Sequence, residues 1–256
     1  MAGILDKFAL DGKVAIVTGS ERGLGQGMAA ALAQAGADIV GVTCVEAAPE
    51  TAAAVAASGR RYVHVVADLV STEPVPRIIE AALKAFGRVD ILVNNAGIIK
   101  RNDAVDFSEK DWDDVMNVNL KTLFFLSQAF ARQVIAQKSG GKIVSVASML
   151  SFQGGIRVPS YTASKSGVKG LTMLMANEWA KHGINANAIA PGYMATDNTA
   201  QLRADEQRAS DILARIPAGR WGTPDDVAGA VVFLCSAAAE YVNGYTLAVD
   251  GGWLAR

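Results

Sequence analysis

The feature that most constrains the fold is a regular alternation of short apolar runs with longer segments of helical periodicity. The short runs are predicted as strands over 13–18, 38–43, 62–68, 91–97, 142–148, 185–191 and 245–250. The segments between them are predicted as helices near 24–35, 50–57, 75–86, 109–137, 160–181 and 224–236. Apolar strands joined through helices belong in a parallel sheet that is covered on both faces. We therefore predict an α/β fold, a Rossmann-type doubly wound parallel sheet of about seven strands with helices on both faces.

The chain has 256 residues, which suits one large domain. No Pro/Ser-rich linker or sustained charge run divides it, so we predict a single dinucleotide-binding and catalytic domain over residues 1–256. The least regular segment, 192–222, is polar and follows the sixth predicted strand. An insertion after the carboxyl end of a strand commonly covers a ligand site in such sheets. We expect this segment to cover the substrate.

The charge is balanced, with 24 Lys and Arg against 25 Asp and Glu, a net charge of -1. This balance argues against a nucleic-acid partner and against a polybasic membrane surface. We expect no signal peptide and no transmembrane helix. Cys44 and Cys235 are predicted to be reduced core thiols of a cytoplasmic protein. His64 and His182 have no neighbour at ligand spacing, so no metal site is expected.

A glycine-rich stretch, "VTGSERGLGQG", follows the first predicted strand and opens the first predicted helix. Gly19 can make a tight turn, Gly23 lets the backbone approach a pyrophosphate, and Gly25 permits close packing of helix on strand. The helix N-terminus offers free N–H groups to phosphates. The spacing is G-x-x-x-G-x-G, which departs from the general dinucleotide fingerprint. An ordinary glycine-rich turn is the alternative interpretation.

Polar residues also end the third and fourth predicted strands. Asp68 could accept a hydrogen bond from an adenine amino group, or it could be a turn residue. The sequence "NNAG", residues 94–97, could brace neighbouring loops with its backbone against a cofactor. Since Asn and Gly are favoured in turns, a simple turn is the alternative there.

Tyr161 and Lys165 lie four residues apart in a predicted helix and therefore share one face of it. A free tyrosine has a pKa of about 10, and lowering it to near 7 needs roughly 4 kcal/mol of anion stabilisation. A nearby ammonium in a partly dry site can supply that energy, so we predict a lowered tyrosine pKa. Alone, the pair could equally be a solvated helix surface.

Two further residues support a catalytic interpretation of this pair. Ser148 lies at the end of the fifth predicted strand and could donate a hydrogen bond to a substrate carbonyl. Asn119, inside a predicted helix, could hold a water beside the lysine. A turn-capping serine and a helix-kinking or surface asparagine are the alternatives.

Together, "TGSERGLG", "NNAG", "NVN", "SYTASKSG" and "APGYMAT" resemble the short-chain dehydrogenase/reductase family, from about residue 8 to the C-terminus. The resemblance implies that Tyr161 is the general acid/base, Ser148 orients the carbonyl, Lys165 binds the cofactor ribose and lowers the tyrosine pKa, and Asn119 holds a relay water. It also implies a homotetramer. The residues expected to contact the dinucleotide are Gly19, Arg22, Gly23, Leu24, Gly25, Thr43, Asp68, Leu69, Asn95, Ala96, Gly97, Tyr161, Lys165, Pro191, Gly192 and Thr196.

The end of the second strand gives conflicting signals on NAD against NADP. Thr43 stands where NAD-preferring relatives commonly have Asp, and Glu46 adds a negative charge nearby. Arg22 could reach a 2′-phosphate, or it could be a solvated loop arginine. We favour NAD as the cofactor, with NADP possible.

Positive charges near the expected substrate pocket favour a carboxylate substrate. Lys100 and Arg101 follow "NNAGII", and Arg157 precedes the catalytic helix, although each could be a surface charge. Stretches such as "KRNDAVDFSEKDWDDVMNVN" and "VNGYTLAVDGGWLAR" resemble the sugar-acid branch of the family. That branch oxidises C5 of 2-dehydro-3-deoxy-D-gluconate or C3 of 2-deoxy-D-gluconate, with gluconate 5-dehydrogenases as near relatives. The expected substrate contacts are Arg101, Arg157, Ser148 and Gln153.

Two other functions compete with a sugar-acid dehydrogenase. A 3-oxoacyl carrier-protein reductase would favour NADPH and a basic docking patch, which the balanced charge disfavours. A dinucleotide-sensing protein without turnover would be expected to lack part of the Ser–Tyr–Lys set, which is complete here.

Overall fold

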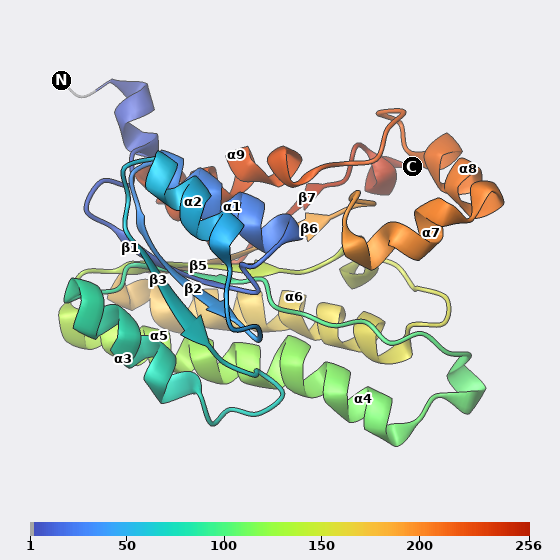
Figure 1. Cartoon of the computed structure of the whole chain (residues 1–256), viewed down its shortest axis with the longest axis horizontal. Coiled ribbons are helices and arrows are strands. Elements are labelled where there is room, and N and C mark those ends of the chain that lie inside the picture. The colour runs from blue at the N-terminus through green and yellow to red at the C-terminus, as the bar shows by residue number, and fades with distance from the viewer. Residues whose placement is uncertain (1–2) are drawn as a thin grey trace.

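The computed structural model describes residues 3–256, and all seven of its strands belong to one parallel sheet (Figure 1). The strands are β1 Val14–Thr18, β2 Asp38–Thr43, β3 Tyr62–Val66, β4 Ile91–Asn94, β5 Gly141–Val146, β6 Ile184–Pro191 and β7 Thr246–Val249. Their order is β3-β2-β1-β4-β5-β6-β7, with every neighbouring pair parallel. The order reverses between β1 and β4, which is where open α/β sheets bind ligands. The predicted doubly wound sheet is confirmed.

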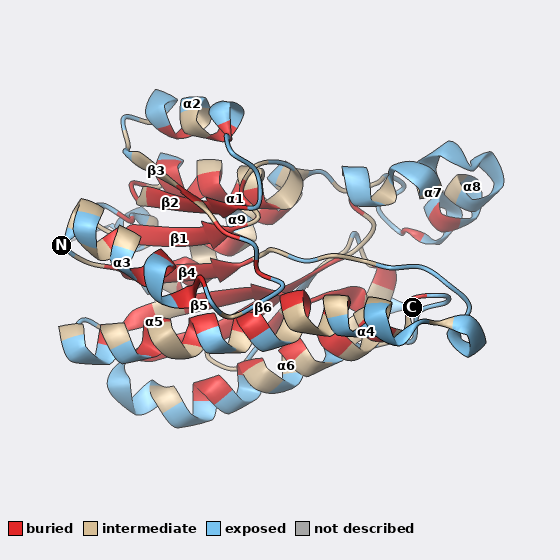
Figure 2. Cartoon of the chain, turned by 60° about the horizontal axis from the view of Figure 1, so that its bottom comes forward, coloured by how far each residue is buried: buried red, intermediate tan, exposed pale blue. Residues whose placement is uncertain are grey.

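Helices cover both faces of this sheet (Figure 1). One face carries α1 Gly23–Gln34, α2 Pro49–Ala57 and α9 Pro224–Cys235, and the other carries α3 Val75–Phe86, α4 Glu109–Met116, α5 Leu123–Gln137 and α6 Pro159–Trp179. Successive residues of a strand point to opposite faces, so Val17 packs in the core under α1 and α9 while Ile16 packs in the core under α3 and α5. The strands are buried on both sides (Figure 2).

Four strands end earlier than predicted. β3 ends at Val66, β4 at Asn94, β5 at Val146 and β7 at Val249. The residues after β3 and β4 still bond to the ends of the neighbouring strands, since the N–H of Ala67 donates to the carbonyl oxygen of Thr43 in β2. The main-chain N–H groups of Asn95 and Ala96 both donate to Oγ1 of Thr18, each at 3.0 Å. Asp68 therefore lies in a loop, two residues beyond its strand.

The long helix predicted over 109–137 is interrupted. Between α4 and α5 the chain forms a π-helical segment, Asn117–Thr122. The π turn is held by Asn119, whose side chain bonds to the loop after β4 instead of facing solvent. π-helical turns inside α-helices are rare and frequently lie at functional sites.

The polar segment 192–222 contains two short helices. They are α7 Ala200–Ala204 and α8 Glu206–Arg215, which project from the body of the domain on the side toward which the strands point (Figures 1 and 2). Ile212 of α8 packs with Met149 and Trp253 in a small separate cluster. This packing places the segment beside the carboxyl ends of β5 and β6.

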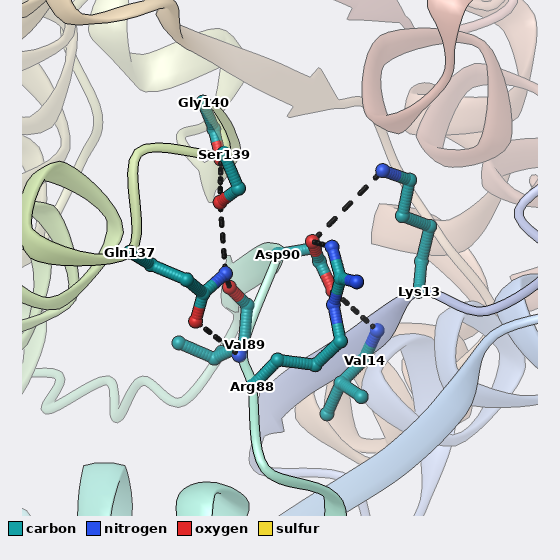
Figure 3. Close-up of polar contacts among 8 residues, drawn as sticks. All are labelled: Lys13, Val14, Arg88, Val89, Asp90, Gln137, Ser139 and Gly140. Carbon is teal, nitrogen blue, oxygen red and sulfur yellow. Dashed lines mark hydrogen bonds and ion pairs between the residues drawn. The ribbon is translucent and has the colours of Figure 1, made fainter.

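At the other end of the sheet, where the strands begin, the buried carboxylate of Asp90 joins β1 to β4 (Figure 3). It accepts hydrogen bonds from the main-chain N–H of Val14 at 3.0 Å and from Nε of Arg88 at 2.9 Å. The side chain of Gln137 bonds to both main-chain groups of Val89. These contacts fix the start of β4 beside β1, so this end of the sheet is structural.

None of the helices in the described range is long and apolar enough to cross a membrane.

Candidate active site

A cavity of about 360 Å³ lies at the carboxyl ends of the strands. It is lined by the loop between β1 and α1, by the ends of β2 to β6, by the start of α6 and by residues 196–199. Every residue predicted to contact the dinucleotide lines this cavity, together with Ser148. Its size suits a small-molecule site. The sheet thus brings together residues that are up to about 180 positions apart in the sequence.

The glycine loop has the geometry that the approach of a phosphate requires. Gly19 and Gly23 adopt positive φ angles of 63° and 57°, which residues with a Cβ rarely adopt. A Cβ on Gly25 would collide with the carbonyl oxygen of Gly19 and the side-chain amide of Asn95. The loop is therefore packed tightly on the start of α1, whose N-terminus faces the cavity.

Asn95 fixes this loop to the end of β4. Its Nδ2 donates to the main-chain oxygens of Thr18 and Gly19, each at 2.9 Å. Asn94, the preceding residue, donates to Oγ of Ser127 inside the core, at 2.9 Å. Asn95 therefore braces the glycine loop as predicted, whereas Asn94 bonds to α5 and β5 in the core instead of to a loop.

Tyr161 and Lys165 lie on one face of α6 and both line the cavity, as predicted. Ser148 follows β5 and lines the cavity beside them. Nζ of Lys165 is buried, donates to the carbonyl oxygen of Val146 at 2.6 Å, and lies 5.6 Å from the centroid of the Tyr161 ring. The predicted Ser–Tyr–Lys set is therefore gathered at one wall.

The pKa of Tyr161 is shifted in the direction opposite to our prediction. Burial raises the pKa of the phenol, while a hydrogen bond with Ser148 and the positive charge of Arg101 lower it by less. The prediction of a lowered value is wrong because the ammonium is directed at Val146 and not at the phenol oxygen. Burial also lowers the pKa of Lys165 itself, to about 8. The desolvation of both groups outweighs their mutual attraction in this state of the protein.

Asn119 lies in the π-helical segment between α4 and α5. Its Oδ1 accepts from the N–H of Ile98 at 2.9 Å, and its Nδ2 donates to the carbonyl of Ile98 at 2.9 Å and to Oγ of Ser164 at 3.3 Å. The side chain thus ties the loop after β4 to the catalytic helix α6. Its role in holding a water stays a prediction.

Of the residues predicted to bind substrate, Ser148 is in the described lining of the cavity, and Arg101, Arg157 and Gln153 are not. Arg101 is exposed and donates to the carbonyl of Asn198 at 3.1 Å. Arg157 forms an ion pair with Asp103 at 2.9 Å, and Oε1 of Gln153 accepts from Nε1 of Trp253 at 3.2 Å. Arg101 is the arginine whose charge acts on Tyr161.

At the end of the cavity formed by the glycine loop and the end of β2, the acidic residue in the lining is not the one that the sequence suggested. Glu46, the acid on which the preference for NAD rested, is exposed and does not line the cavity among the residues described. Glu21 of the glycine loop does line it, although sequence reasoning passed over this residue. The position of Glu21 between Gly19 and Gly23, inside the predicted phosphate-binding loop, was the sequence signal that could have identified it. Cys44, predicted in the core, is exposed at the same end, whereas Cys235 is buried.

Comparison with known proteins matches these observations. The family described as Enoyl-(Acyl carrier protein) reductase matches residues 18–254. A curated relative, 2-dehydro-3-deoxy-D-gluconate 5-dehydrogenase of Escherichia coli (strain K12), is 67% identical and covers 99% of this chain and 100% of that protein. A solved short-chain type dehydrogenase/reductase from Mycobacterium marinum is 31% identical, with a TM-score of 0.94 and coverage of 99% and 100%.

The chain belongs to the short-chain dehydrogenase/reductase family. It is an NAD(P)-dependent oxidoreductase that acts on CH–OH groups. The family resemblance, the fold and the dinucleotide cofactor predicted from the sequence are confirmed. Another solved relative is a gluconate 5-dehydrogenase from Burkholderia cenocepacia J2315 in complex with NADP and tartrate. It is 41% identical, with a TM-score of 0.94 and coverage of 99% and 100%.

Proposed function

We propose that this short-chain dehydrogenase/reductase interconverts a secondary alcohol and a ketone on a six-carbon sugar acid. The substrate that fits best is 2-dehydro-3-deoxy-D-gluconate, reacting at C5. The observation that carries the proposal is a complete Ser–Tyr–Lys set at the cavity, with the positively charged guanidinium of Arg101 bonded at 3.1 Å to Asn198, a residue of the cavity lining. A carboxylated substrate matches that charge, and the 67% identical relative is named for this reaction.

The residues of the cavity divide the chemistry among them. The bound dinucleotide supplies or accepts the hydride. The Ser148 hydroxyl donates to the substrate oxygen, and the Tyr161 hydroxyl transfers a proton to it in reduction or takes one from it in oxidation. Lys165, anchored on Val146, provides the cation of the site.

The segment 192–222 is the part of the domain that would cover the substrate. Its residues 196–199 line the cavity, and Asn198 receives the hydrogen bond from Arg101. The bond to Asn198 ties the guanidinium of Arg101 to the covering segment. This is the position from which a guanidinium can hold the carboxylate end of a short sugar acid.

Replacing Arg101 with alanine is expected to raise KM for sugar acids by roughly tenfold to a hundredfold, because a charge-assisted hydrogen bond contributes about 1.5–3 kcal/mol. KM for neutral polyols should change little. Arg157→Ala is the matched control, since Asp103 already neutralises that guanidinium, and a smaller effect is expected. Equal losses on charged and neutral substrates in Arg101→Ala would exclude the carboxylate role.

The proposed function is tested by initial rates on a panel of ketones with NADH and NADPH. We expect the fastest reduction for the C5 ketone of 2-dehydro-3-deoxy-D-gluconate. Reduction of 5-ketogluconate and of the C3 ketone of 2-deoxy-D-gluconate should be slower. A 3-oxoacyl thioester is included because a relative from Vibrio cholerae, 40% identical, is named as a 3-oxoacyl-[acyl-carrier-protein] reductase. Preferred turnover of the thioester would refute the sugar-acid proposal.

We also propose that the chain assembles as a homotetramer through the outer helices. Large apolar side chains are exposed on α4, α5 and α6, namely Trp112, Phe125, Ile135, Met173 and Leu174. Such clusters commonly mark protein interfaces. In sedimentation velocity, Phe125→Asp is expected to sediment as a smaller species than the wild type. Leu5→Asp, on an exposed side chain of the 3-10 helix Ile4–Phe8, should not change the assembly, and a monomeric wild type would contradict the proposal.

A cytoplasmic location is proposed on the state of the cysteines. Both are free, and Cys44 is exposed, a state that reducing compartments preserve.

A further inference from the structure

We propose that Glu21 selects the cofactor, favouring a dinucleotide with a free adenosine 2′-hydroxyl over one with a 2′-phosphate. The inference rests on the proposed function only in that the cavity binds a dinucleotide. In many dinucleotide folds a carboxylate at the end of the second strand makes this selection. Here that strand end lacks an acid in the cavity, and the carboxylate comes from the glycine loop.

The end of β2 is not available for this role. Thr43 is buried, and its hydroxyl lies 2.8 Å from the carbonyl oxygen of Val45 and 2.7 Å from Nε2 of His64. Its polar atom is therefore occupied within the protein. A threonine also carries no charge with which to repel a phosphate.

Glu21 lines the same end of the cavity, and its carboxylate lies beside Tyr62. Oε2 of Glu21 is buried and accepts no hydrogen bond within residues 3–256, while the neighbouring hydroxyls of Tyr62 and Ser20 face each other. Buried polar atoms almost always have partners in a working protein. A ribose hydroxyl is a donor and matches an unpaired carboxylate oxygen, whereas a phosphate offers only acceptors and negative charge.

The charges of the cavity support the same preference. Among its described lining residues, Glu21, Asp68 and Asp197 are acidic, and Arg22 and Lys165 are basic. Lys165 lies beside Tyr161, so Arg22 is the basic lining residue near the glycine loop and Glu21. A phosphate monoester would bring a charge of about −2 to a region that is already acidic.

Arg22 does not restore the balance, because it forms an ion pair with Asp197 at 3.1 Å. Both side chains are largely exposed, so this pair contributes little energy and can open at small cost. The partly buried carboxylate of Glu21 is less screened by salt and therefore has the larger influence on the cofactor.

The test is equilibrium binding of NADH and NADPH, followed by quenching of tryptophan fluorescence and by calorimetry. The wild type is expected to bind NADH more tightly than NADPH. In Glu21→Gln, which keeps the shape and removes the charge, the ratio of the two Kd values should shift toward NADPH by about tenfold. Glu46→Gln removes the same charge from an exposed side chain outside the cavity lining and should leave the ratio within about twofold.

Each outcome of the binding experiment either supports or overturns the selection of the cofactor by Glu21. An unchanged ratio in Glu21→Gln, or a wild type that binds NADPH more tightly, would overturn the selection by Glu21 while leaving the dehydrogenase proposal intact. Binding of neither dinucleotide to the wild type would refute both. If Glu21→Gln does not fold, Glu21→Ser removes the same charge and gives the same comparison.

Discussion

Tyr161→Phe is expected to lower kcat by about a thousandfold to ten-thousandfold, because it removes the only atom with which this side chain can transfer a proton. The ring remains and fills the same space on α6. The affinity for NADH should therefore change by no more than about twofold. Steady-state rates on the sugar-acid ketone and fluorescence titration with NADH measure the two quantities separately.

Tyr245→Phe is the control for this change, since Tyr245 is exposed and lies outside the described lining of the cavity. It should retain wild-type rates. A Tyr161→Phe protein that turns over at close to the wild-type rate would show that another group, or water, transfers the proton. Loss of NADH binding together with turnover would instead assign Tyr161 a role in holding the cofactor.

Lys165→Met is expected to abolish turnover and at the same time to raise the stability of the fold. Lys165 is buried, and burial lowers its pKa to about 8. An unfolded lysine has a pKa of about 10.4, so keeping the charged form buried at pH 7 costs up to about 3 kcal/mol. The hydrogen bond to Val146, lost in the variant, offsets part of this gain. A net gain of about 1 kcal/mol corresponds to a Tm increase of about 2–4 °C.

The pH dependence gives the sharper test. The folded pKa of Lys165 lies below the unfolded value, so the unfolded chain binds the extra proton between pH about 8 and about 10.4. Across this window the wild type gains stability from this group as the pH rises, and Lys165→Met does not. Its advantage over the wild type should therefore shrink between pH 7 and pH 10.

Lys181→Met, on an exposed side chain, is the control and should follow the wild type across this range. Thermal melts at both pH values, with the other groups of the chain unchanged, isolate the contribution of Lys165. Parallel curves for the wild type and Lys165→Met would show that burial of the ammonium carries no cost. A lowered Tm at pH 7 would show that the bond to Val146 outweighs it.

Much of the active site could be predicted from the sequence, because the positions of its residues depend on the local periodicity of helices and turns. The spacing of Tyr161 and Lys165 puts both on one face of a helix wherever that helix lies. The glycines at positions 19, 23 and 25 belong to one turn between a strand and a helix, and the turn forms as predicted. The parallel sheet then brings the carboxyl ends of its strands together, so Ser148 reaches the same cavity as the glycine loop.

The sequence alone therefore determined the alternation of strands and helices, the family, and the predicted dinucleotide contacts that line the cavity. Tertiary structure decided three other matters, since each depends on contacts between distant segments. It buries Tyr161 and Lys165 so that desolvation controls both pKa values. It pairs Arg157 with Asp103 but leaves the charge of Arg101 to act on the phenol. It also brings Glu21 into the lining of the cavity and leaves Glu46 exposed outside that lining, because the path of the chain in space, and not the distance along it, sets which charge a ligand meets.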